Sequence, residues 1–218
     1  MPTTTDLPKG DKTRSEIVRA AEQLFAEQGF RAMTLRDVTR EAQVNLAAVN
    51  YHFGSKRKLM LAVIRNRFEP INLERLKQLD ALIAAYAADP VPVDAIFGAL
   101  FRPLFESAHA EKDQVLMQMI GRAITEPADF IRTIHKEFFT ELSARFMTEL
   151  QRSCPHISTA ALQYRFFMAI STMIGTIIEQ VLLQELSAGT LDPTDFETIV
   201  DELIAFTVAG FIQAEPAA

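Results

Sequence analysis

Apolar residues recur at three- and four-residue intervals along nearly the whole chain. Near the N-terminus, for example, Ile17, Ala20, Ala21 and Leu24 fall on one face at helical spacing, which is the period of an amphipathic helix. Prolines and polar clusters around residues 89–92, 127, 155 and 192–195 divide the rest into further helical segments. The pattern predicts an all-α protein of about nine helices and favours no strand.

Several segment ends carry recognisable signals. Thr13 and Glu16 form a capping-box pattern at the start of the first helix, and Gly29 is a natural left-handed stop. We expect one helix to end near residue 68, before Pro70, and continuous helices over 128–151 and 159–186. Residues 1–11 are expected to form a mobile basic tail, either a solvated terminus or an arm that touches DNA phosphates.

The stretch from Met33 to Lys58 has the layout of a helix-turn-helix DNA reader. Thr34 with Asp37 forms a second capping-box pattern, and Asn45 is a favourable N-cap for a helix over 46–52. That helix begins with small residues, so it can lie deep in a major groove. The basic run 56–58 follows within one turn, and it is either a set of phosphate clamps or a solvated face.

Residues 14–64, RSEIVRAAEQLFAEQGFRAMTLRDVTREAQVNLAAVNYHFGSKRKLMLAVI, resemble the DNA-binding domain of the TetR family of transcriptional regulators. Within it, VNLAAVNYHFGSK is similar to the PsrA-like, fatty-acid-responsive subgroup. The resemblance implies a three-helix helix-turn-helix domain at residues 12–58 and a larger helical domain at 59–218 for effector binding and dimerisation. It also implies a transcriptional regulator that a small apolar effector releases from a palindromic operator. We expect this regulator to be a repressor.

The resemblance carries DNA contacts onto specific positions. Thr34 and Arg36 would hold a phosphate at the start of the second helix, and Val49 and Phe53 would be core. Gln43 and Asn50 depart from the family, which usually has Gly and often has Tyr at these positions. The expected DNA-binding residues are Thr34, Arg36, Asn45, Ala47, Ala48, Asn50, Tyr51, His52 and Lys56.

The charge distribution supports a DNA-binding first third. Residues 1–67 hold 12 Lys and Arg against 7 Asp and Glu, a net of +5, whereas residues 68–218 carry a net of −11. A basic segment joined to an acidic body favours binding of double-stranded DNA through the segment alone.

The body is rich in Phe and Met, which indicates either ordinary core or an apolar effector cavity. A fatty acid or acyl thioester is the effector that we expect, with Arg102, Arg122, Arg132 or Arg165 meeting an acidic head group. The residues chosen for the cavity are Phe97, Phe101, Phe105, Met117, Arg122, Phe138 and Phe167.

The last two helices are apolar on more than one side, which is typical of either buried core or a subunit interface. A symmetric dimer reads a palindrome, so we expect a homodimer. The residues chosen for the interface are Phe166, Ile170, Ile174, Ile177, Val181 and Phe206.

Other function classes find little support in the sequence. There is no glycine-rich phosphate loop, nucleophile elbow or zinc-ligand spacing, so we expect no catalytic residue, no metal and no cofactor. The single cysteine, Cys154, excludes an internal disulfide. No secretory signal or uninterrupted membrane-length apolar run is evident, which favours a cytoplasmic protein with no membrane role. An all-α ligand-binding protein or an enzyme without a DNA role is the alternative.

Overall fold

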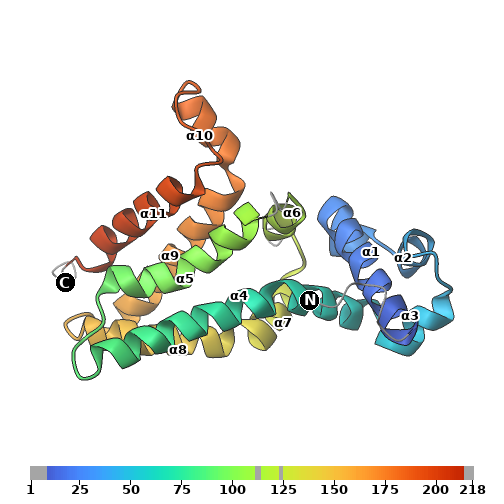
Figure 1. Ribbon diagram of the computed structural model, residues 1–218, viewed down its shortest axis with the longest axis horizontal. Helices are drawn as coiled ribbons and strands as arrows, with labels where there is room; N and C mark the ends of the chain where they lie inside the picture. The colour runs from blue at the N-terminus through green and yellow to red at the C-terminus, as the bar shows by residue number, and fades with distance from the viewer. Residues whose placement is uncertain (1–8, 111–113, 123–124, 214–218) are drawn as a thin grey trace.

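The structure is a computed structural model that describes residues 9–110, 114–122 and 125–213 of the 218-residue chain. The described residues form eleven α-helices and no strand (Figure 1). The predicted all-α class is therefore confirmed, and the estimate of about nine helices is approximate. The helices are α1 Lys9–Ala32, α2 Leu35–Glu41, α3 Leu46–Phe53, α4 Lys56–Tyr86, α5 Val93–Ala110, α6 Gln114–Arg122, α7 Ala128–Phe138, α8 Thr140–Ser153, α9 Thr159–Ile178, α10 Gln180–Leu186 and α11 Phe196–Phe211.

A small N-terminal unit, the reader domain, consists of α1 to α3 and the first turns of α4, at the right of Figure 1. Its apolar faces meet in one core that includes Ile17, Phe25, Val38, Val49 and Leu59. Phe130 from α7 packs into the same core. The reader domain is therefore built partly on the rest of the chain, the body.

The body is organised around the rest of α4, which packs along α5. Helix α11 lies on α5 and on α9, and α8 packs against α5 and α9. Aromatic rings fill these contacts: Phe97 of α5 meets Phe211 of α11 edge to face at 5.1 Å between centroids, and Phe105 meets Phe196 in the same way. Because α4 belongs to both units, it is the direct mechanical link between them.

Four predicted boundaries require correction. Helix α4 continues through Pro70, because Ile71, Arg75 and Leu79 beyond it are buried against the body and offset the lost hydrogen bond. The expected helix 128–151 breaks at Phe139, and the expected helix 159–186 breaks at Glu179. Residues 9–11 of the expected tail are the first turn of α1, and residues 1–8 lie outside the described residues.

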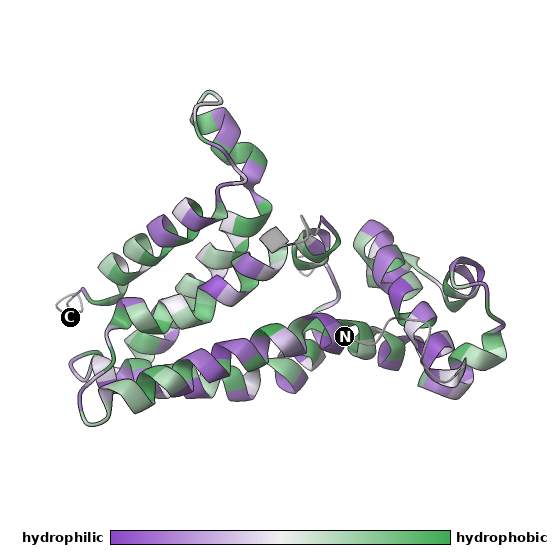
Figure 2. Cartoon of the chain, viewed as in Figure 1, coloured by the Kyte–Doolittle hydropathy of each residue, from purple (hydrophilic) through white to green (hydrophobic). Residues whose placement is uncertain are grey.

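Helix α9 is, within the described residues, the one helix long and apolar enough to cross a membrane by length and composition. It packs against α6, α8 and α11 within the body, and 28% of the residues in its apolar stretch are buried inside the described part of the chain. Beyond it, α10 projects from the body (Figure 1). Figure 2 shows hydrophobic segments in green along α10 and α11, and Val181, Leu186 and Phe206 in this region are exposed.

Candidate nucleic-acid interface and effector cavity

The two caps of the helix-turn-helix form as the sequence predicts. Asp37 N–H donates to Thr34 Oγ1 at 3.2 Å, and Thr34 N–H donates back to Asp37 Oδ2 at 3.1 Å. Asn45 Oδ1 accepts a hydrogen bond from Ala48 N–H at 2.9 Å. The Thr34 hydroxyl also donates to Asp37 at 2.7 Å, and this bond is the main cause that lowers the pKa of the Asp37 carboxyl. Thr34 and Asn45 thus position α2 and α3, and any DNA contact from them comes from a side chain already used as a cap.

The turn between α2 and α3 keeps a left-handed residue. Gln43 has φ of 53°, the region that glycine enters without steric cost. This explains why the related domains usually carry glycine here. Gln43 therefore holds a backbone conformation that is unfavourable for a residue with a Cβ.

Helix α3 presents a small, polar outer face to solvent. Ala47, Asn50 and Tyr51 are exposed, Tyr51 at 87% of its surface, and Ala48 and His52 are half-buried. Val49 and Phe53 point into the reader domain and are buried, which confirms their expected core role. The exposed face has the shape and hydrogen-bonding tips that a major groove accepts.

The basic residues beside α3 are not equally free to meet a phosphate. Lys56 Nζ lies 4.7 Å from the centre of the Phe30 ring and 3.4 Å from Arg31 O. Burial lowers the pKa of Lys56, and the nearby Glu126 carboxylate opposes that shift. Arg36 and Lys58 are exposed, so they offer unobstructed charge.

Arg57 is committed to the body. Its guanidinium pairs with the Asp129 carboxylate at 3.0 Å, and also donates to Asp129 O and to Thr133 Oγ1. Hydrogen bonding from Arg57 lowers the pKa of Asp129. Within the basic run 56–58, Arg57 therefore joins the two units, whereas Lys58 is exposed to solvent.

Contacts between α1 and the α6–α7 region complete this junction. Arg122 donates to Ala26 O at 3.1 Å and to Glu27 O, at the C-terminal end of the regular part of α1. Phe30 N–H donates to Glu126 Oε1 at 2.7 Å, and the Phe30 ring stacks on Phe130 at 4.2 Å. These contacts link the position of α1 to the position of α6 and α7.

An apolar cavity of about 430 Å³ lies in the body next to this junction. Its volume falls within the usual range of small-molecule sites, about 300–1,000 Å³. Phe25 of α1 and Ile64 and Phe68 of α4 form the wall nearest the reader domain, and α6 and α7 also contribute. Contents of the cavity would therefore touch the elements that hold the reader domain.

The seven residues chosen from the sequence for an effector cavity lie in different parts of the structure. Of the seven, all of which are described, Phe167 lines the cavity. The three α5 phenylalanines, Phe97, Phe101 and Phe105, are buried against α11 and the rest of the core. Arg122 and Phe138 belong to the junction with the reader domain, and Met117 contacts Gln180.

Of the arginines expected to meet an acidic head group, three are occupied elsewhere. Arg102 pairs with Asp201, and Arg122 donates a hydrogen bond to Ala26 O of α1. Arg165 donates to Phe211 O and Gln213 O. None of these three, nor Arg132, is among the cavity residues. The arginine that lines the cavity is Arg75, which is 3% exposed. Ile71 and Leu79, four residues before and after Arg75, are buried on the same face of α4.

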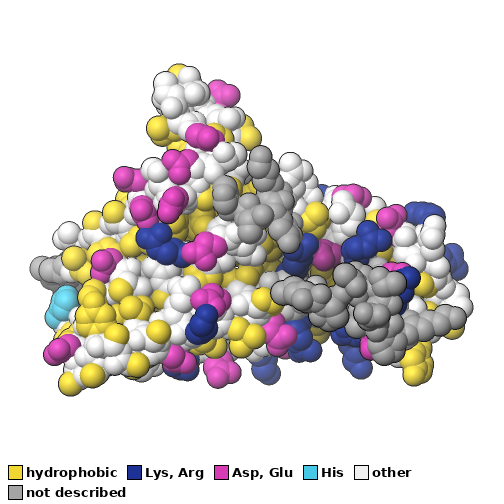
Figure 3. Space-filling model, in the orientation of Figure 1, with side chains coloured by type: hydrophobic (Ala, Val, Ile, Leu, Met, Phe, Trp, Pro, Cys, Tyr) yellow, Lys and Arg dark blue, Asp and Glu magenta, His cyan; other side chains and the backbone are white. Residues whose placement is uncertain are grey.

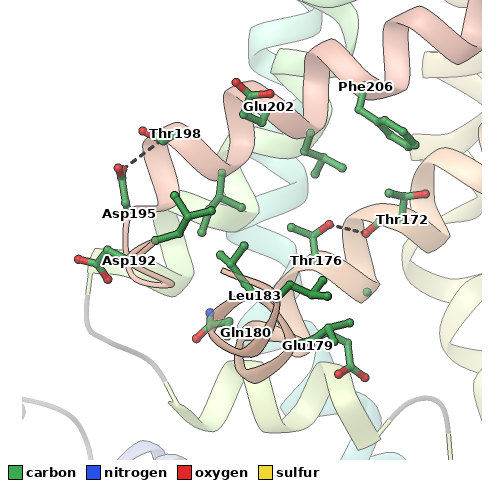
Figure 4. A pocket seen from close by; sticks show the side chains of 16 residues that line it. Thr172, Thr176, Glu179, Gln180, Leu183, Asp192, Asp195, Thr198, Glu202 and Phe206 are labelled. Carbon is green, nitrogen blue, oxygen red and sulfur yellow. Dashed lines mark hydrogen bonds between the residues drawn. The ribbon is translucent and has the colours of Figure 1, made fainter. Parts of the chain in front are cut away.

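An open apolar groove of about 710 Å³ lies between α9, α10 and α11 (Figure 4). Leu183 and Leu186 of α10 and Phe206 of α11 line it. Of the expected interface residues, Val181 and Phe206 are exposed, at 70% and 72%. Phe166 and Ile177 are buried within the subunit, and Phe166, Ile170 and Ile174 line the cavity. The interface role expected of these residues stays a prediction.

The two units differ in the charge of their surfaces. Figure 3 shows dark blue side chains over the reader domain and acidic side chains gathered over α10 and α11. Over the described ranges, no group of three or more His, Cys, Asp or Glu side chains is arranged to hold a metal ion. Cys154 is buried, and burial raises the pKa of its thiol.

Two family models match the chain. The model described as bacterial regulatory proteins, tetR family, matches residues 17–63, and the tetracyclin repressor-like C-terminal domain matches residues 98–210. The second match covers more than half of the 218 residues.

Individual proteins show the same likeness. The transcriptional repressor NicS of Pseudomonas putida is 26% identical over 53% of this chain and 60% of its own length. The regulator BetI of Rhizobium meliloti is 26% identical over 65% and 66%, so the chain spans less than two thirds of either relative. The dual regulator CecR of Shigella flexneri is 25% identical over 94% of this chain and 91% of its own. The structure of FadR, a fatty acid degradation regulator from Bacillus halodurans, superposes with a TM-score of 0.65 at 14% identity over 91% of this chain and 95% of FadR.

Proposed function

The chain belongs to the TetR family of bacterial regulatory proteins, and from that premise we propose that it is a homodimeric, DNA-binding transcriptional repressor released by a small apolar effector. The observation that carries the proposal is the capped α2–α3 pair with an exposed outer face on α3. We assign it no catalytic role.

In this proposal α3 enters the major groove. Ala47 and Ala48 allow close approach, and Asn50 reaches an adenine edge, which an amide can pair with twice. Tyr51, His52 and Lys58 contact phosphates, and Arg36 does so at the start of α2. Thr34, Asn45 and Lys56 act mainly by fixing the helices, because their polar atoms already have partners in the subunit.

Dimerisation proceeds through α9, α10 and α11. Only 28% of the residues in the most apolar part of α9 are buried inside the described subunit. Val181, Leu186 and Phe206 are exposed apolar side chains nearby. Exposed apolar patches of this kind mark sites of interaction with another protein. A second copy of the chain covers this surface, and the dimer then places its two α3 helices against the two halves of a palindromic operator.

The effector occupies the cavity of about 430 Å³. Its lining is mostly aliphatic and aromatic, which suits a fatty acid or an acyl thioester. FadR of Bacillus halodurans, whose fold is similar, is a regulator of fatty acid degradation, in agreement with this class.

Release from DNA follows from differential binding. An effector in the cavity shifts the population toward whichever arrangement it binds better. Phe25 of α1, Ile64 of α4 and Ile134 of α7 line the cavity, and these three helices meet at the junction. The arrangement that the effector favours therefore differs in how α1 packs on α6 and α7. The two α3 helices of the dimer then lose their groove spacing.

The test is fluorescence anisotropy with the full-length dimer and labelled DNA from upstream of its own coding region. Titrations at several salt concentrations, with scrambled DNA as a control, are repeated with and without a long-chain fatty acid and its thioester. Tight, salt-dependent binding that either compound weakens supports the proposal. Equal binding to scrambled DNA, followed by failure of a genomic-fragment selection, would refute the DNA-binding role.

A further inference from the structure

Arg75 is a buried cation in an apolar cavity. Its side chain lies on α4 at 3% exposure, and the residues around the cavity are otherwise apolar except for His135, Ser143 and Gln163. Among the described residues that line the cavity, none is acidic. A charged group in such surroundings is costly unless it is paired.

The partners of Arg75 within the described chain are neutral. Nε donates to Leu100 O at 2.7 Å, Nη1 to Asn72 Oδ1 at 3.1 Å, and Nη2 approaches the Met173 sulfur at 3.9 Å. A thioether is a weak acceptor. The guanidinium is thus held in place by two good bonds, while its Nη2 end has a weak partner.

Burial lowers the pKa of Arg75 to about 10, with no compensating carboxylate. At neutral pH the group is still charged, because this value lies well above 7. The cavity therefore holds a net positive charge. Arg57, Arg102 and Arg145, by contrast, each face an aspartate.

We propose that Arg75 is the residue that determines effector class, and that it selects an amphiphile with a free carboxylate over a neutral or thioester-linked chain of the same length. This inference rests on the proposed effector cavity. A guanidinium and a carboxylate form charge-assisted hydrogen bonds in a planar fork. The bonds to Leu100 and Asn72 orient the fork before the ligand arrives, which lowers the entropic cost of binding.

The geometry also orients the apolar chain. Of the α4 residues that line the cavity, Ile64 and Phe68 lie toward the reader domain and Arg75 lies farthest from it. Ile64 and Arg75 are separated by about 16 Å along the helix at 1.5 Å per residue. A carboxylate at Arg75 therefore directs its chain toward Phe25 of α1, where the ligand reaches the reader domain.

A plainer role for Arg75 is to staple α4 to α5 through Leu100 O. Such a role predicts lower stability when Arg75 is replaced and no effect on which head group binds. The ratio of two affinities separates the roles, since a general loss of stability weakens both ligands alike.

The experiment is isothermal titration calorimetry on the delipidated full-length dimer with decanoate, decan-1-ol and the decanoyl thioester of coenzyme A. Wild-type protein is expected to bind decanoate at least about tenfold more tightly than the alcohol, the size of a charge-assisted hydrogen bond. Arg75→Met should abolish that preference, and Arg75→Lys should retain part of it. Arg102→Met, which removes an arginine outside the cavity, is the matched control and should preserve the preference.

Equal wild-type affinity for acid and alcohol, or a preference that survives in Arg75→Met, overturns the inference while leaving the cavity as an effector site. Tighter binding of the thioester than of the acid overturns it as well. If none of the three compounds binds, the proposed apolar effector fails together with the inference, and DNA binding is judged separately by anisotropy. If Arg75→Met does not fold, the wild-type ratio and Arg75→Lys decide the matter.

Discussion

The backbone N–H of Phe30 donates to Glu126 Oε1 at 2.7 Å, across the junction between the reader domain and the body. The residue before it, Gly29, has φ of 79° and ψ of 171°. A Cβ on Gly29 would lie 2.5 Å from that same Glu126 oxygen. Glycine here permits both the left-handed backbone and the close approach of the body.

Replacing Gly29 with alanine should therefore destabilise the protein. The backbone alone costs about 1–3 kcal/mol in a region that only glycine populates freely, and the Cβ displaces Glu126. Thermal unfolding at fixed protein concentration measures the loss. Gly10→Ala, in the same helix with open space around it, is the control and should be neutral or slightly stabilising. Combining Gly29→Ala with Glu126→Ala should recover the part of the lost stability that is caused by the overlap between the alanine Cβ and the Glu126 side chain.

Replacing Gln43 with glycine should stabilise the reader domain by up to about 1 kcal/mol, because Gln43 holds a left-handed φ of 53°. Gln43→Ala keeps the Cβ and should bring no such gain. Urea unfolding measures both variants. A destabilised Gln43→Gly would mean that chain flexibility outweighs the steric relief in this turn.

The Arg57–Asp129 pair should make stability depend on pH in acid. The pKa of Asp129 lies below its ordinary value of 3.8 in the folded protein. Its contribution is therefore complete above that ordinary value and is lost as pH falls through the folded pKa. Asp129→Asn should be less stable than wild type at pH 7, and the difference should shrink as the pH falls below 3.8 and through the lowered pKa of Asp129. The difference should also shrink at high salt, since the pair is partly exposed.

Two substitutions should divide DNA affinity into its sequence-reading and charge-dependent parts. Asn50→Ala should cost about 1–3 kcal/mol on the operator and relax preference at one base pair. Lys58→Ala should weaken binding to all sequences and lower the salt slope by about 1. Lys77→Ala, a body lysine paired with Glu74, is the control. A salt slope unchanged by Lys58→Ala would remove that residue from the phosphate contacts.

Local features could be predicted from the sequence, and contacts between distant segments could not. The caps at Thr34 and Asn45 formed as expected because a cap involves residues three positions apart. The residues at which the two long predicted helices break, Phe139 and Glu179, are neither glycine nor proline, so no local signal marks these breaks. Arg75 was missed for a related reason: an arginine between leucines suggests a solvated face, and its burial is decided by α5 and α9.

A buried hydroxyl on α11 offers a further test of the packing between α11 and its neighbours. Thr207 is 8% exposed, and its Oγ1 has no hydrogen-bond partner within the described part of the chain. By contrast, Thr176 Oγ1 donates to Thr172 O at 2.9 Å on the facing helix α9. A buried hydroxyl without a partner carries a desolvation cost and no compensating bond.

Thr207→Val removes that hydroxyl and keeps nearly the same shape, so it should stabilise the protein by about 1 kcal/mol. Thr176→Val removes a hydroxyl that is bonded, and it should be neutral or destabilising. Both are measured by thermal unfolding of the dimer at one protein concentration, because dimerisation contributes to the midpoint. If Thr207→Val instead lowers the midpoint, the Thr207 hydroxyl has a hydrogen-bond partner in the folded protein, and α11 packs on its neighbours in a different arrangement.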